Sequence, residues 1–68
     1  MEQTKGLDQM LKRFREGRGM TQAQLAEKAG VTREYVTMLE SGAKVSPSLQ
    51  VLKALAKALG VKVADLLG

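Results

Sequence analysis

The stretch TQAQLAEKAGVTREYVTMLESG, residues 21–42, holds two short helical patterns separated by a single glycine, Gly30. The first pattern opens with a full helix start signal, because Thr21 is a good N-cap residue and Gln24 three positions later completes a capping box. Glycine adopts at little cost the left-handed conformation that ends a helix, so Gly30 is expected to terminate it. The stretch therefore predicts two helices that meet at a sharp turn.

The second pattern has little apolar surface to bury. Thr32 is its expected N-cap, and Val31 with Val36 forms a hydrophobic staple. Val36 and Leu39 are its inward-facing residues, while Ala26 on the preceding helix is small enough for a close crossing. A helix with so few buried groups leaves one face free, and we expect that face to contact a partner.

Two further stretches carry apolar residues at helical spacing, one near the start of the chain and one after the turn-rich residues 41–48. These apolar residues are Leu7, Met10, Leu11 and Phe14, followed by Leu49, Leu52, Leu55, Ala56 and Leu59. Each set lies on one face of a helix, so two more amphipathic helices are expected. The glycines of residues 17–19 and Gly60 end them.

A short last helix is expected around residues 63–67, although Lys62 at its start is not a preferred capping residue. The sequence thus predicts an all-α fold of five compactly packed helices. It forms a single domain of residues 1–68, with a helix-turn-helix motif at about residues 21–41.

The composition is that of a small basic domain, with 68 residues, a net charge of +4 and a pI near 9.8. This balance modestly favours anionic partners, although ordinary solubility charge is equally consistent with it. Cysteine and histidine are absent, which removes the commonest metal ligands and the commonest general base. We therefore expect no enzyme, no metal and no cofactor.

No apolar run approaches the roughly 20 residues of a membrane span, and the polar start is no signal peptide, so the default location is the cytoplasm.

Five residues of the motif, Gln22, Ala26, Gly30, Val36 and Leu39, resemble the spaced pattern of the helix-turn-helix in phage repressor and Cro-like regulators. The stretches GMTQAQLAEKAGV, MLESG and LKALAKALGV are similar to that family's second, third and fourth helices. The resemblance covers nearly the whole chain after its first six residues. It implies a repressor-like DNA-binding domain that regulates transcription, as a repressor, at the bacterial or phage nucleoid.

The resemblance places the outer face of the helix after Gly30 in the DNA major groove, where its first residues reach base edges. Arg33, Glu34, Thr37 and Met38 are then the base-reading candidates. Arg33 can donate two hydrogen bonds to guanine and Glu34 can accept one from cytosine, whereas Thr37 offers a hydroxyl and a methyl group. Met38 replaces a polar reader of the family and can contact a thymine methyl. The alternative for Arg33 is a solvated surface charge.

Phosphate contacts are expected from the start of the first motif helix and from the loop that follows the second. Gln22 lies where backbone N–H groups favour an anion, and by resemblance its amide braces a phosphate or a neighbouring base reader. Thr32 is a further bracing candidate, and Lys44 and Ser46 are phosphate candidates in the loop. The alternative for Gln22 is a simple exposed first-turn residue. Tyr35 is interpreted as structural.

The resemblance also implies an ion pair between Arg15, on the first helix, and Glu40, at the end of the third. Related repressors often have such a pair, which would set the angle of the third helix against the body of the domain. The alternative is two separate solvated charges.

One copy of such a domain buries too little DNA surface for tight selective binding, so we expect a homodimer on a palindromic operator. The apolar residues at the end of the chain are the candidates for its interface: Val61, Val63, Leu66 and Leu67. The alternative is that these residues only cover the core.

A second functional hypothesis is a protein-interaction module of the antitoxin type. Glu34 and Met38 on the outer face of the second motif helix are consistent with this alternative.

Overall fold

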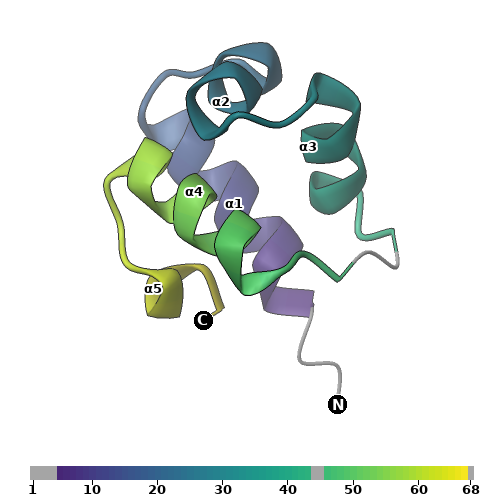
Figure 1. Cartoon of the computed structure of the whole chain (residues 1–68), viewed down its shortest axis with the longest axis vertical. Helices are drawn as coiled ribbons and strands as arrows, with labels where there is room; N and C mark the ends of the chain where they lie inside the picture. Colours follow the sequence, from purple (N-terminus) through teal and green to yellow (C-terminus); the bar gives the residue numbers. More distant parts are fainter. Residues whose placement is uncertain (1–4, 44–45, 68) are drawn as a thin grey trace.

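The computed structural model describes residues 5–43 and 46–67. Within these ranges the chain is all-α and has no strand, which confirms the predicted fold class. The five helices, drawn in Figure 1, are α1 (Lys5–Gly17), α2 (Gln22–Ala29), α3 (Arg33–Glu40), α4 (Leu49–Leu59) and α5 (Val63–Leu67). None of these helices has both the length and the apolar character that crossing a membrane would require.

The junction between α2 and α3 is built from local hydrogen bonds. The Thr21 hydroxyl accepts from the backbone N–H of Gln24, whose side chain accepts from the Thr21 N–H, so the capping box is complete. Gly30 ends α2 with φ of 76°, in the left-handed region. Thr32 then caps α3 by accepting from the Tyr35 N–H at 3.1 Å. These caps leave α2 and α3 separated by only three residues, as the sequence predicts.

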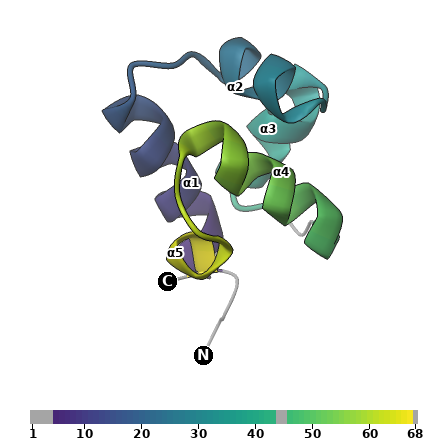
Figure 2. The ribbon, with the colours of Figure 1, turned by 60° about the vertical axis from the view of Figure 1, so that its left-hand side comes forward.

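The core is aliphatic and is shared by all five helices. Its buried members are Leu7, Leu11, Leu25, Ala26, Val36, Leu39, Leu55, Ala56, Leu59 and Leu66. Helix α3 packs against α1 and α2, while α5 packs against α1 and α4, away from α3 (Figures 1 and 2). Only Val36 and Leu39 of α3 enter the core, so most of that helix lies outside it.

Three expectations from the sequence are wrong or incomplete. Leu49, placed on the inward stripe of the fourth helix, is 60% exposed, because α4 buries its second half. Leu66, a candidate for the dimer interface, is fully buried, because α5 packs onto both α1 and α4 and encloses it. The expectation for the start of α5 is incomplete: Lys62 is not an N-cap, but its N–H donates to the Asp65 carboxylate at 2.9 Å, which is the reciprocal half of a capping box.

The left-handed conformation of Gly30 yields a stability prediction. A Cβ atom at this position would meet nothing within 4 Å, so the cost of Gly30→Ala comes from its φ alone. We expect the free energy of unfolding to fall by about 1–2 kcal/mol, measured by urea denaturation. Gly17→Ala is the control, because Gly17 lies in α1 with equal space around it. That change should stabilise by about 0.5–1 kcal/mol; equal effects of the two substitutions would contradict the prediction.

Candidate nucleic-acid interface

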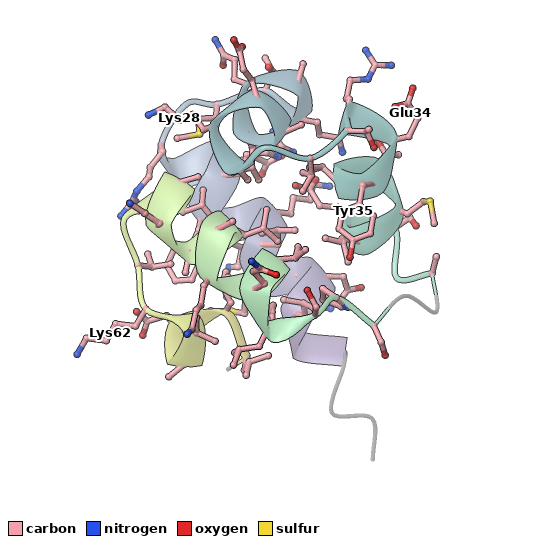
Figure 3. The ribbon with its side chains drawn as sticks, viewed as in Figure 1. Lys28, Glu34, Tyr35 and Lys62 are labelled. Carbon is pink, nitrogen blue, oxygen red and sulfur yellow. The ribbon has the colours of Figure 1, made fainter. Side chains whose placement is uncertain are left out.

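The outward face of α3 consists of side chains that the core does not use. Arg33, Glu34, Thr37 and Met38 are all exposed, and Met38 retains 46% of its accessible surface. Figure 3 shows Glu34 pointing away from the body of the molecule. Tyr35 is partly buried and packs against the core. The four candidate readers therefore share one free surface, on a helix that begins at Arg33.

Arg15 and Glu40 form a bidentate ion pair that fastens α1 to the last residue of α3. Arg15 Nε donates to Glu40 Oε2 at 2.7 Å, and Nη2 donates to Oε1 at 3.0 Å. The side chains are only 10% and 4% exposed. Arg15 Nη1 also donates to the Met20 carbonyl at 2.7 Å, just before α2. One guanidinium thus connects three segments of the chain. Its planar arrangement of N–H donors matches the two oxygens of the carboxylate, which the single ammonium group of a lysine would not do.

The guanidinium of Arg15 stays charged over the whole physiological pH range. The hydrogen bonds to Glu40 raise the pKa of Arg15 above its ordinary value, although burial by itself would lower it. A raised pKa on a basic group stabilises the fold at every pH below the ordinary arginine pKa. Among the described residues, no buried side-chain nitrogen or oxygen lacks a hydrogen-bond partner. The pair is therefore a satisfied polar element inside an otherwise aliphatic core.

Gln22, the first residue of α2, connects this ion pair to the surface of α3. Its Nε2 donates to Glu40 Oε1 at 3.0 Å, and its Oε1 accepts from the Thr37 hydroxyl at 2.8 Å. The Arg33 carbonyl is a second acceptor for that hydroxyl, at 3.0 Å. The structure thus places Gln22 in contact with one candidate reader, Thr37. The contact with Glu40 has no counterpart in the sequence interpretation.

A shallow hollow of about 390 Å³ lies over these groups and contains three residues that the sequence analysis missed. Lys12 and Glu16 from α1 and Ser41 after α3 line it together with Gln22 and Thr37. The sequence does hold a signal for Lys12, because it lies three residues before Arg15 and so on the same side of α1. Both Lys12 and Glu16 are exposed, so this surface carries one added positive and one added negative charge.

The remaining bracing and phosphate candidates are less tightly placed. The Thr32 hydroxyl serves the N-cap of α3, and its side chain is exposed. Ser46 is exposed in the segment before α4, and Lys44 lies outside the described residues. Ser48, two residues after Ser46, caps α4 by accepting from the Val51 N–H at 3.2 Å.

The apolar residues near the end of the chain divide into two groups. Val61 and Val63 are half-buried against the core, whereas Leu67 is 53% exposed. Leu49, at the start of α4, adds an exposed apolar side chain that the sequence analysis did not assign to any surface. With Leu66 removed from the candidates, Leu67 is the most exposed of those that remain.

Comparison with known proteins agrees with this geometry. A family described as helix-turn-helix matches residues 11–66. The chain is 43% identical over 60 residues to the immunity repressor protein of Bacillus phage phi105, covering 88% of the chain and 41% of that protein. It is 36% identical over 61 residues to the HTH-type transcriptional regulator SinR of Bacillus subtilis, covering 90% of the chain and 55% of SinR. The chain thus spans about half, or less, of the length of these relatives.

The fold matches solved structures as well. A crystal structure described as the master regulator for biofilm formation SinR in complex with DNA superimposes with a TM-score of 0.87. Its sequence identity is 35%, and the match covers 91% of this chain and 98% of that one. The chain therefore belongs to the helix-turn-helix family of the repressor and Cro-like type.

The ion pair predicts a non-additive pattern of stability. Arg15→Met and Glu40→Leu each leave one charge buried without its partner, at a cost of about 3–5 kcal/mol. The double variant leaves neither charge, so it should retain the fold and melt above both single variants. Thermal unfolding followed by circular dichroism measures this.

Arg13→Met is the control, because Arg13 lies on α1 but is exposed. It should shift the melting temperature little. Additive losses in the double variant would show that the two charges act separately.

Proposed function

We propose that this domain binds double-stranded DNA sequence-specifically and regulates transcription as a repressor, with α3 in the major groove. The observation that carries the proposal is the exposed polar face of α3, which the buried Arg15–Glu40 pair orients beside Gln22. An α-helix fits the major groove, and the first turn of a recognition helix reaches base edges. An immunity repressor among the relatives and a DNA complex among the similar structures support the same function.

Arg33 and Glu34 would lead the reading, because α3 begins with them. Arg33 presents a fork of donors that suits guanine O6 and N7. Glu34 accepts from cytosine N4 but is repelled by phosphates, so it selects more than it attracts. Met38 gives an apolar contact, suited to a thymine methyl. Acting on DNA would place the protein at the bacterial or phage nucleoid in the cytoplasm.

Phosphate contacts would come from the groups around the hollow described above. The N-terminal end of α2 carries free N–H groups and the positive end of the helix dipole. Gln22 uses one amide proton for Glu40, which leaves its second for a phosphate oxygen. Lys12 lines the same hollow. Ser46 and Lys44 remain candidates for phosphate contacts from the loop between α3 and α4.

Two copies on a palindromic operator would supply the DNA surface that one copy lacks. The apolar interface would use Leu67, with Val61 and Val63 at its edge, and half-sites would lie about 34–36 Å apart. Sedimentation at micromolar concentration, with and without a palindromic duplex, tests this assembly. A monomer in both cases would contradict the homodimer.

A protein-interaction module of the antitoxin type is the second candidate. Met38 at 46% exposure and Glu34 on the same surface favour it, because an apolar and an acidic side chain suit a protein partner better than phosphates. Salt dependence separates the two functions. DNA affinity should fall steeply with salt, at a log–log slope near −0.9 per phosphate neutralised. A flat response, or no bound duplex after selection from a random library, would favour the protein partner.

Arg33→Ala tests the assignment of the reading helix. We expect the variant to lose discrimination at one base pair by about 1–3 kcal/mol, with other positions unchanged. Selection of bound duplexes from a random library measures the preference. Lys28→Ala removes the same charge on α2, at the opposite side of the view from Glu34 (Figure 3), and should leave the selected motif unchanged. An unchanged motif with Arg33→Ala would show that α3 does not read the bases.

Lys12→Ala tests the phosphate contact. The substitution should weaken binding to all duplexes alike and reduce the magnitude of the salt slope by about 0.9. Fluorescence anisotropy at several salt concentrations, on the selected duplex and on a scrambled one, measures both effects. A loss confined to the selected duplex would instead make Lys12 a base-reading residue.

A further inference from the structure

The hydrogen bonds that run from the ion pair to α3 have a fixed direction. Arginine can only donate, and an ionised carboxylate can only accept. Glu40 Oε1 accepts from Arg15 Nη2 and from Gln22 Nε2, both at 3.0 Å. Gln22 must therefore turn its NH2 group toward Glu40, which turns its carbonyl oxygen toward Thr37. The orientation of the half-buried Gln22 amide is thus set by a buried charge.

The hydroxyl of Thr37 has its single proton committed within the protein. Two groups lie within hydrogen-bond distance of Oγ1: Gln22 Oε1 at 2.8 Å and the Arg33 carbonyl at 3.0 Å. Both are acceptors only, so the proton goes to one of them. A hydroxyl has one proton and two lone pairs, so Thr37 retains accepting capacity together with its methyl group. Thr37 is otherwise exposed on α3.

We propose that Thr37 reads the duplex as an acceptor and a methyl group, never as a donor, and that it thereby selects an A·T base pair. The inference rests on the proposed function and names the specificity of one residue within it. In the major groove an A·T pair offers the adenine N6 amino donor and the thymine methyl. A G·C pair also offers an amino donor, cytosine N4, but it has no methyl group, and an oxygen without a free proton cannot satisfy the guanine acceptors N7 and O6. The thymine methyl is therefore the group that distinguishes A·T from G·C for Thr37.

Gln22 has a positioning role in this arrangement, because it acts on the duplex through Thr37. Without the Gln22 carbonyl, the hydroxyl proton keeps one acceptor, the Arg33 carbonyl, and loses its shorter partner. A guanine acceptor then competes for the proton with the Arg33 carbonyl alone, and no longer with two acceptors of the protein. Loss of Gln22 should therefore make guanine better tolerated at the base pair that Thr37 reads. If Gln22 only stabilised the fold, its loss would not change this base preference.

Two single substitutions, each removing one functional group, test the reading by Thr37. Thr37→Val keeps a methyl group and removes the acceptor, whereas Thr37→Ser keeps the hydroxyl and removes the methyl. Selection from a random duplex library with the parent protein and both variants identifies the base pair whose preference changes. We expect that pair to be A·T in the parent. Replacing its thymine by uracil should weaken binding about fourfold in the parent and in Thr37→Val, and not in Thr37→Ser.

A guanine at the responsive pair, bound more weakly by the parent when 7-deazaguanine replaces it, would show that Thr37 donates and would overturn the proposal. If duplexes are selected but no pair responds to either Thr37 variant, the proposal falls. In that case a response to Arg33→Ala leaves the proposed function intact. Absence of any selected duplex would overturn both.

Gln22→Ala in the same selection tests the positioning role. We expect guanine at the responsive pair to be tolerated at least threefold better, relative to the parent, beyond any loss of affinity common to all sequences. Gln24→Ala is the matched control, because Gln24 lies on the same helix and only completes the capping box of Thr21. It should lower stability without changing the preference. If Gln22→Ala instead weakens binding to all sequences equally, Gln22 contacts a phosphate and does not position Thr37.

Discussion

The bidentate contact between Arg15 and Glu40 determines where α3 lies. This helix gives only Val36 and Leu39 to the core, and two aliphatic side chains do not by themselves set the rotation of a helix about its axis. The planar guanidinium adds a directional constraint at the last residue of α3, and its third bond to the Met20 carbonyl ties the start of α2 to the same point. The exposed face of α3 is therefore presented in one orientation.

The same contact connects stability with recognition. Buried ion pairs contribute little net stability, because desolvation offsets the attraction between the charges. In this molecule the pair also directs the amide of Gln22 toward Thr37, so that a buried charge determines what an exposed residue can offer a base. Lys12 lines the adjoining hollow, which brings α1 into the surface formed by α2 and α3. Orientation, more than stability, is what the pair supplies.

Much of this fold could be predicted from the sequence, because its determinants are local. The capping box of Thr21 and the termination of α2 at Gly30 each depend on residues only a few positions apart in the sequence. The errors arose where burial depends on distant elements. Leu49 shares the helical periodicity of its neighbours, yet it lies exposed at the first residue of α4, before Val51 and Leu52 reach the core. Leu66 belongs to a helix of only five residues, yet α1 and α4 enclose it.

Residues close together along the chain suffice to specify where the helices begin and end, and which side chains share one face of each helix. The tertiary structure alone decided which faces meet: that Gln22 contacts both Glu40, 18 residues away, and Thr37, 15 residues away. It likewise brought Lys12 to the same hollow. Helical periodicity relates residues within one helix, whereas a contact between helices depends on crossing angles that the packing of the whole core sets.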